Sequence, residues 1–279
     1  DFCLSRGLGD VYKRQILGSG LFGLLLLGAF VVVELRIQEP MLDLRLLSDR
    51  LFCTTNLVTM FSGAGFLGVL FMAPLFLQEA RGTSALVSGL TTFPEAVGVI
   101  VSTQLVARLY PSIGPRRLVA AGLTGVALIV SLFAFIDLDT NLWLMRGLMF
   151  LTGAGMAFTF TATPAAAFAT ISPAATGKAS ALYSAQRQVG SALGVALVSS
   201  VLSIVGPISL NAHGTAQPNL TAYHAAFLTS AALALLAACI ALFIHDRDAA
   251  ATMHRKGSVE KSVELKEVTE AAPEVFILE

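Results

Sequence analysis

The chain of 279 residues is 55% hydrophobic and only 13% charged, and its mean hydropathy is +0.76. Soluble domains carry about 25% charged residues, so this composition excludes an ordinary soluble domain and indicates an integral membrane protein with the lipid bilayer as its partner. Eighteen basic and eighteen acidic residues cancel to zero net charge, which gives no support for nucleic acid as a partner. The cysteines Cys3, Cys53 and Cys239 are scattered without metal or disulfide spacing, and we predict no cofactor or metal site.

The first segment, residues 1–15, is polar and lacks an initiating methionine. It stops abruptly where a long apolar run begins, and it resembles a translated adaptor or assembly sequence, so we expect a non-native leader. On this interpretation, native sequence extends upstream of Ile16 and the chain is part of a longer protein.

Long apolar runs then follow at regular intervals, and each is long enough to cross a hydrocarbon core that takes about 20 helical residues. The seven runs are Ile16–Val33, Leu51–Leu77, Ala85–Ala107, Leu118–Ile136, Leu142–Phe168, Ala179–Val205 and Tyr223–Ile244. They predict an all-α membrane protein with seven transmembrane helices. Pro74, Pro94 and Pro164 lie inside three of the runs and are expected to kink those helices.

Basic residues divide unequally between the two ends of these predicted helices. One set of connections carries Arg36, Arg45, Arg50, Arg108, Arg116, Arg117, Lys178, Arg247, Arg255 and Lys256. The opposite set carries only Arg81 once residues 1–15 are set aside. By the positive-inside rule, the first set and the C-terminus are cytoplasmic in a multi-pass protein of the cell (inner or plasma) membrane.

Two segments outside the apolar runs have their own character. Residues 35–50 form a cytoplasmic linker in which leucines alternate with charges, and Met41, Leu44 and Leu47 would share one helical face. This pattern predicts a short interfacial helix over Glu39–Arg50. Residues 246–279 are rich in Glu, Lys and Ser and predict a disordered cytoplasmic tail.

An arginine interrupts the sixth run. Arg187 lies about nine residues after Lys178, roughly 13 Å along a helix axis, and is therefore not at the water boundary. A cation at such depth costs roughly 3 kcal/mol on insertion scales, so it normally faces a partner or a wet cavity between helices. Helical spacing places Arg187 on one face with Tyr183, Gly190 and Gly194. The two glycines predict close packing of a neighbouring helix.

A second polar strip runs beside this face through Ser184, Gln188 and Ser191. A seam of polar and small residues in a membrane helix suggests a pathway for a substrate or for protons. Other polar positions inside the runs, Asn56, Thr59, Ser62 and Gln104, are expected mainly to form hydrogen bonds between helices.

A carboxylate interrupts the third run. Glu95 follows Pro94 near the middle of the predicted span, on one face with Thr91, Gly98 and Ser102 that would suit a cavity wall. A buried carboxyl group can exchange a proton, which is the chemistry of a proton-coupled pump. Three interpretations stay open: a proton-binding site, an ion pair with an arginine, Arg187 or Arg146, and a side chain on the lipid face.

Four segments resemble one family as a set: PMLDLRLLSDRLF, PLFLQEARGTSALVSGLTTFPEAVG, ARLYPSIGPRRLVAAG and SALYSAQRQVGSALGVAL. They are similar to the C-terminal part of the fourteen-span drug/proton antiporters (EmrB/QacA type) of the major facilitator superfamily, from about Ile16 to Ile244. The resemblance implies that residues 16–34 belong to the inserted central helix pair. It also implies that residues 51–245 form a six-helix C-terminal domain of two inverted three-helix repeats, facing an N-terminal half.

The resemblance also suggests roles for single residues. Arg187 matches the arginine of an RQxGG-like motif, which implies substrate or proton coupling, or support of the polar core; the alternative is a structural arginine that satisfies backbone carbonyls. The family often has an uncharged residue where this chain has Glu95. Arg146 would face the cavity near the outer gate, or else extend to the membrane interface.

The string RLYPSIGPRR resembles a cytoplasmic gating loop that clamps adjacent helices, with Arg108, Gly114, Arg116 and Arg117 at its positions. Pro111 and Ser112 replace the family's aspartate and arginine, so the clamp is incomplete, and the alternative role of Arg116 and Arg117 is to set the topology.

We therefore predict the C-terminal part of a proton-coupled efflux transporter of drugs or metabolites that works by alternating access. Its partners would be protons, small amphipathic substrates and the N-terminal half. A membrane-embedded enzyme is the main rival, but the runs and connections hold no HExxH, GxSxG, acidic metal-ligand pair or phosphate loop. A channel or structural membrane subunit is the third possibility. No catalytic residue is predicted.

Overall fold

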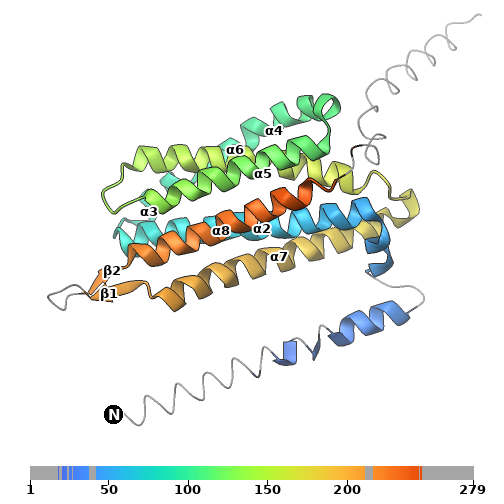
Figure 1. The fold of residues 1–279 in the computed structure, drawn as a ribbon, viewed down its shortest axis with the longest axis horizontal. Helices are drawn as coiled ribbons and strands as arrows, with labels where there is room; N and C mark the ends of the chain where they lie inside the picture. Colours follow the sequence, from blue (N-terminus) through green and yellow to red (C-terminus); the bar gives the residue numbers. More distant parts are fainter. Residues whose placement is uncertain are drawn as a thin grey trace, which may run out of the picture.

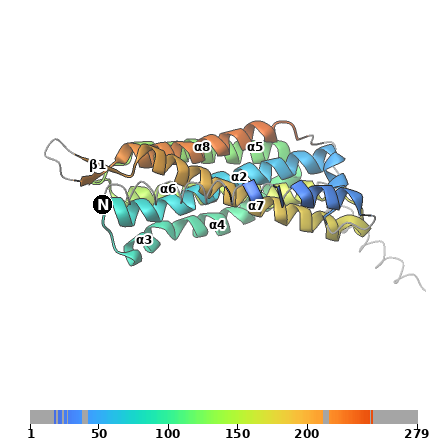
Figure 2. The same ribbon diagram turned by 90° about the horizontal axis from the view of Figure 1, so that it is seen from below.

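The computed structural model of the chain describes residues 18, 21–23, 25–26, 28–37, 42–210, 216–244 and 246. Long helices run side by side in a bundle, with a short hairpin at one end (Figure 1, Figure 2). The elements are η1 (Leu44–Ser48), α2 (Arg50–Leu75), η2 (Phe76–Ala80), α3 (Ala85–Thr92), α4 (Pro94–Ile113), α5 (Pro115–Leu132), η3 (Phe133–Phe135), α6 (Leu142–Ala167), η4 (Pro173–Ala175), α7 (Thr176–Val205), β1 (Ile208–Leu210), β2 (Ala216–Pro218) and α8 (Leu220–Ala241).

Six helical stretches of the described residues are long and apolar enough to cross a membrane. They are Arg50–Ala80, Ala85–Ile113, Pro115–Phe135, Leu142–Ala167, Pro173–Val205 and Leu220–Ala241. They coincide with the last six predicted spans and confirm the all-α membrane fold. The first predicted span, Ile16–Val33, lies partly outside the described residues; those of its residues that are described are helical and, except at one half-buried position, exposed.

The predicted gating loop is mostly helical, which corrects the sequence interpretation. Helix α4 continues through Pro111 to Ile113, so Arg108 lies on its last turns. Gly114 alone separates the helices, with a φ of +84° that glycine adopts readily. Pro115 starts α5 because its fixed φ suits a first helical position, and Arg116 and Arg117 follow in the first turn. An apolar run therefore shows where the membrane core ends, not where the helix ends.

The predicted interfacial helix is also shorter than expected. Residues 39–41 lie outside the described part of the chain, and the following residues form only the five-residue 3₁₀ helix η1. Asp43 accepts a hydrogen bond from the backbone N–H of Arg45 at 3.2 Å, and Asp49 accepts one from Phe52 at 2.8 Å to cap α2. Two aspartate caps this close together leave no room for a longer helix.

The connection before α8 contains a hairpin that the sequence did not indicate. Strands β1 and β2 pair in antiparallel register, with Ile208 opposite Pro218. The side-chain amide of Asn219 donates a hydrogen bond at 2.8 Å to the carbonyl of Gly206, whose φ is +85°. These contacts hold the two ends of the connection together where α7 ends and α8 begins.

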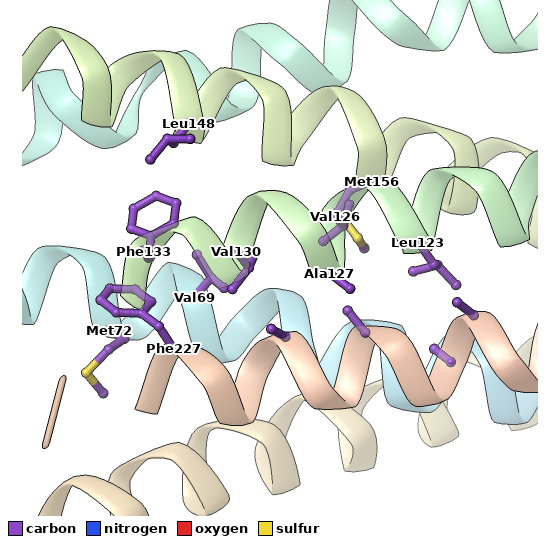
Figure 3. Packing of buried hydrophobic residues seen from close by; sticks show 14 of the residues in the cluster. Val69, Met72, Leu123, Val126, Ala127, Val130, Phe133, Leu148, Met156 and Phe227 are labelled. Atoms are coloured by element: carbon purple, nitrogen blue, oxygen red, sulfur yellow. The ribbon is translucent and has the colours of Figure 1, made fainter. Parts of the chain in front are cut away.

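The core lies among four central helices. Helices α2, α8, α5 and α6 pack in a ring, each against the next, and their apolar side chains interlock (Figure 3). The buried residues labelled there are Val69 and Met72 on α2, Leu123, Val126, Ala127 and Val130 on α5, Phe133 on η3, Leu148 and Met156 on α6, and Phe227 on α8. Phe133 and Phe227 bring their ring centroids to 5.0 Å and tie α5 to α8.

The two remaining spans flank this ring. Helix α4 packs against α6, and α7 packs against α2 and α8. In the most apolar stretch of each of these two spans only 22% of the residues are buried, against 44% or 56% in the other four. The largest contacts map onto one another when the first three spans are exchanged with the last three: α4–α6 maps onto α7–α2, and α2–α8 maps onto α6–α5. The exchange is not exact, because α7 also packs against α8 more extensively than α4 packs against α5. The two flanking helices therefore hold corresponding places, and each leaves much of its surface uncovered by the bundle.

Candidate functional site

Arg187 lies in the middle of α7, roughly 16 Å along the axis from the first residue, Thr176. Its side chain is exposed and lines a cavity of about 300 Å³ between α2, α6 and α7. Within the described residues, no hydrogen bond or ion pair engages its guanidinium group; only its backbone carbonyl accepts a bond, from Ser191 Oγ at 2.9 Å. The arginine is thus presented to the cavity with its donors free.

The cavity has walls of different character. Helix α7 contributes the polar side chains Tyr183, Arg187, Gln188 and Ser191. Helices α2 and α6 contribute the apolar side chains Phe66, Leu67, Phe160 and Pro164, together with Thr59, Ser62, Gly63 and Thr159. Phe66 and Phe160 meet edge to face with ring centroids 5.3 Å apart, which fixes both rings. A concave, largely apolar space with a few polar groups is the usual form of a small-molecule site.

One hydrogen bond joins the two helices beside the cavity. Thr59 Oγ1 lies 2.9 Å from the hydroxyl of Tyr183 and 2.9 Å from the carbonyl of Thr55. Because a hydroxyl has a single proton, the chain of bonds runs consistently from Tyr183 through Thr59 to Thr55. This bond fixes Tyr183 against α2. It confirms the prediction that Thr59 forms a hydrogen bond between helices.

Gly190 and Gly194 lie where α7 approaches α2 most closely. A Cβ on Gly190 would come within 3.0 Å of Met60, and one on Gly194 within 3.0 Å of three backbone atoms of Ala64. Backbone atoms cannot move aside as a flexible side chain can. These glycines set the separation of the helices, and the cavity lies beside them, with Ser191 of α7 and Gly63 of α2 in its lining.

Three buried polar groups near this region were not identified from the sequence as site residues. Thr159 and Thr163 on α6 are 2% and 1% exposed, and neither hydroxyl has a hydrogen-bond partner among the described residues. Gln186 Oε1 on α7 is likewise buried and unpaired within them. The one available sequence signal was the four-residue spacing of the threonines, which places both on one helical face.

Glu95 lies away from the cavity that Arg187 lines. It is in the first turn of α4 and 3% exposed, and the face that it shares with Gly98 packs against α6. A Cβ on Gly153 would come within 3.0 Å of the Glu95 backbone, and one on Gly98 within 3.0 Å of the carbonyl oxygen of Phe150. Because Gly98 and Gly153 have no side chain, the backbones of α4 and α6 can come into contact.

Both carboxylate oxygens of Glu95 lack a hydrogen-bond partner among the described residues. The predicted ion pair with Arg187 or Arg146 is therefore not formed. Nor is Glu95 among the residues that line the Arg187 cavity, so the structure does not bring the two together.

Arg146 lies near the start of α6. Its guanidinium carbon is 4.5 Å from the centroid of the exposed Trp143 ring, a cation–π geometry. Its Nε is buried without a partner in the described part of the chain. The arginine does not line the cavity of Arg187, Gln188 and Tyr183.

Arg108 near the end of α4 and Arg116 and Arg117 at the start of α5 are exposed. The backbone N–H of Arg116 donates a hydrogen bond at 3.0 Å to Asp246 Oδ1, from the segment after α8. Because Gly114 offers no side chain to cap α5, this carboxylate satisfies one of the free N–H groups at the helix start.

Six apolar helices, long enough to cross a membrane, together with a cavity between α2, α6 and α7, define the architecture of a multi-pass membrane protein. The sequence profile of the Major Facilitator Superfamily matches residues 43–276, and the chain belongs to this family. The family assignment indicates a transporter and sets aside the membrane-embedded enzyme.

Relatives with curated names agree with this assignment. The chain is 30% identical over 213 residues to the puromycin resistance protein pur8 of Streptomyces alboniger, covering 75% of this chain and 42% of that protein. It is 32% identical over 186 residues to the multidrug resistance protein Stp of Mycobacterium tuberculosis, covering 66% and 34%. The multidrug transporter protein MdtP of Bacillus subtilis is 28% identical over 191 residues, covering 68% and 35%. The chain thus spans less than half the length of these relatives.

Proposed function

We propose that the chain forms the C-terminal part of a fourteen-span, proton-coupled antiporter that exports amphipathic drugs or metabolites by alternating access. The observation that carries this proposal is the cavity between α2, α6 and α7, which combines the Arg187 side chain with an apolar wall. The names of several relatives refer to resistance to puromycin or to many drugs, and this supports export as the direction of transport.

Glu95 is the proposed proton carrier. Its carboxyl group is buried against α6 without a polar partner in the described residues. A carboxyl group in such a place exchanges a proton only when the α4–α6 contact opens to water. Alternating access supplies that opening, because each change of state repacks the helices that border the transport path.

A second helical half is proposed to cover the exposed faces of α4 and α7. These are the spans that the bundle leaves least buried. The described cationic residues Arg50, Arg108, Arg116, Arg117 and Lys178 lie at one end of the antiparallel helices, and Arg81 lies at the other. This asymmetry supports a cytoplasmic C-terminus in the cell membrane.

Transport by the complete protein in vesicles with an imposed pH gradient tests the proposal. Glu95→Gln should lower gradient-driven accumulation of a fluorescent amphipathic dye at least about tenfold, while dye still moves down its own gradient. Arg187→Ala should lower both movements, because it removes a group of the binding cavity.

Matched controls are Asp139→Asn, which removes an exposed carboxylate, and Lys178→Gln, which removes an exposed cation from α7; both should transport normally. All variants should elute as the same species in size-exclusion chromatography. Normal transport by both Glu95→Gln and Arg187→Ala would refute the assigned roles. Loss of export on ATP depletion with the proton gradient maintained would refute proton coupling.

A further inference from the structure

The lining of the cavity carries positive charge without a compensating negative charge. Among its lining residues the only charged side chain is that of Arg187, and none is Asp or Glu. No hydrogen bond within the described residues uses the guanidinium group. A guanidinium presents five N–H donors in a planar fork that matches the two oxygens of a carboxylate. The group that would pair with the Arg187 guanidinium in this cavity is therefore an acceptor that carries negative charge.

A second group in the cavity is also unpaired. Thr159 is one of the residues that line the same space; its side chain is only 2% exposed, and its hydroxyl oxygen is buried without a hydrogen-bond partner in the described chain. Elsewhere on α6 a threonine satisfies itself, since Thr152 Oγ1 donates to the carbonyl of Leu148 at 2.8 Å. Buried polar groups normally have partners, so we expect the Thr159 hydroxyl to turn toward the polar end of a ligand that enters the cavity.

The remaining wall specifies the rest of that molecule. Phe66, Leu67, Phe160 and Pro164 form an apolar surface opposite the polar side chains of α7. The edge-to-face pair of Phe66 and Phe160 keeps the rings in place and offers aromatic surface. The volume of about 300 Å³ suits a compact ligand of one or two rings.

We propose that this cavity selects amphipathic aromatic acids: the carboxylate binds Arg187, the Thr159 hydroxyl bonds to the same polar end, and the ring packs against the phenylalanines. This inference rests on the proposed export function, since it names the substrate class of that site. It predicts that ligands with the same ring but a neutral or cationic group in place of the carboxylate bind more weakly, because neither group supplies a negatively charged acceptor to the arginine.

Three probes that share one ring system test the inference: naphthoic acid, naphthamide and naphthylmethylamine. Binding to the complete transporter in nanodiscs is measured by calorimetry at neutral pH. The acid should bind at least about tenfold more tightly than the amide, and the amine should bind most weakly, as expected for a charge-assisted bidentate contact. Arg187→Gln should remove the preference for the acid, and Arg187→Lys should keep part of it because the positive charge remains.

Thr159→Val keeps the shape of the side chain and should weaken acid binding about fivefold. The matched controls are Thr152→Val, on the same helix outside the cavity, and Lys178→Gln, which removes a cation from α7 away from it. Neither control should change the order of the three probes.

Equal binding of the three probes, tighter binding of the amine, or an unchanged preference in Arg187→Gln would overturn the inference. So would an equal loss of acid binding in Lys178→Gln, which would mean that only net charge matters. Gradient-driven transport is scored separately. Proton-driven export of the amine alone would support the export function and reject aromatic acids as the substrate class. Selective binding of the acid without gradient-driven transport would support the substrate class and reject proton-driven export.

Discussion

Two helix pairs, α4 with α6 and α7 with α2, occupy equivalent places in the bundle, because exchanging the first three spans with the last three maps one pair onto the other. In both pairs a glycine three residues after an ionic side chain brings the backbones together: Gly98 after Glu95, and Gly190 after Arg187. The outcome differs. Glu95 is buried in the α4–α6 interface, whereas Arg187 is exposed in a cavity.

The difference lies in the length of the side chain and in the residues opposite. Glu95 is short and its backbone faces Gly153, so α6 closes over it. Arg187 is long, and its backbone carbonyl lies toward Gly63 while its side chain extends past the contact into the cavity. The same glycine spacing thus gives one sealed carboxyl group and one accessible cation. These are the two environments that the proposed proton carrier and the proposed substrate site require.

The largest expected effect comes from a new side chain that forces α7 away from α2. In Gly194→Ala the new Cβ meets three backbone atoms of Ala64 within 3.0 Å, so α7 must move away from α2. We expect a loss of about 3 kcal/mol in the free energy of unfolding and loss of ligand binding, because the cavity wall moves with α7. Gly177→Ala, on the same helix with nothing within 4 Å, is the control and should be near neutral. Unfolding in a denaturing detergent and binding of naphthoic acid measure the two effects, and retained binding would contradict the geometry.

A smaller effect is expected at the other pair. Gly153→Ala places its Cβ within 3.0 Å of two backbone atoms of Glu95 and should cost about 2 kcal/mol of stability. Because this interface does not border the cavity, ligand affinity should be unchanged. Gly147→Ala on the same helix, with nothing within 4 Å, is the control. The same unfolding and binding assays apply, and a parallel loss of binding would show that the two pairs are not independent.

The smallest effect concerns the hydrogen bond between Tyr183 and Thr59, which joins α7 to α2. Tyr183→Phe removes the hydroxyl that lies 2.9 Å from Thr59 Oγ1 and should cost about 1 kcal/mol in the same unfolding assay. A double-mutant cycle with Thr59→Val isolates this bond from the one between Thr59 and Thr55. Additive losses in the cycle would mean that the bond contributes nothing to stability.

The sequence alone determined the membrane fold and the last six spans, because burial in hydrocarbon requires long apolar helices whatever their neighbours. It also identified Arg187 and Glu95 as the unusual ionic residues, since charge inside an apolar run is visible without coordinates. Helix ends were less predictable: Arg108 to Ile113 are polar in part, yet they extend α4 because a helix continues beyond the hydrocarbon core until Gly114 breaks it.

Only the tertiary structure decided which groups share a site. Helical spacing places Glu95 on one face with Gly98, and Arg187 on one face with Gly190. The residues that pack opposite each face come from distant segments of the chain, and they determine whether the ionic side chain is buried or exposed to a cavity. The unpaired hydroxyl of Thr159 likewise became visible only when α2, α6 and α7 were seen around one cavity. The physical reason is that periodicity fixes direction along one helix, whereas a cavity depends on the volumes that several helices bring together.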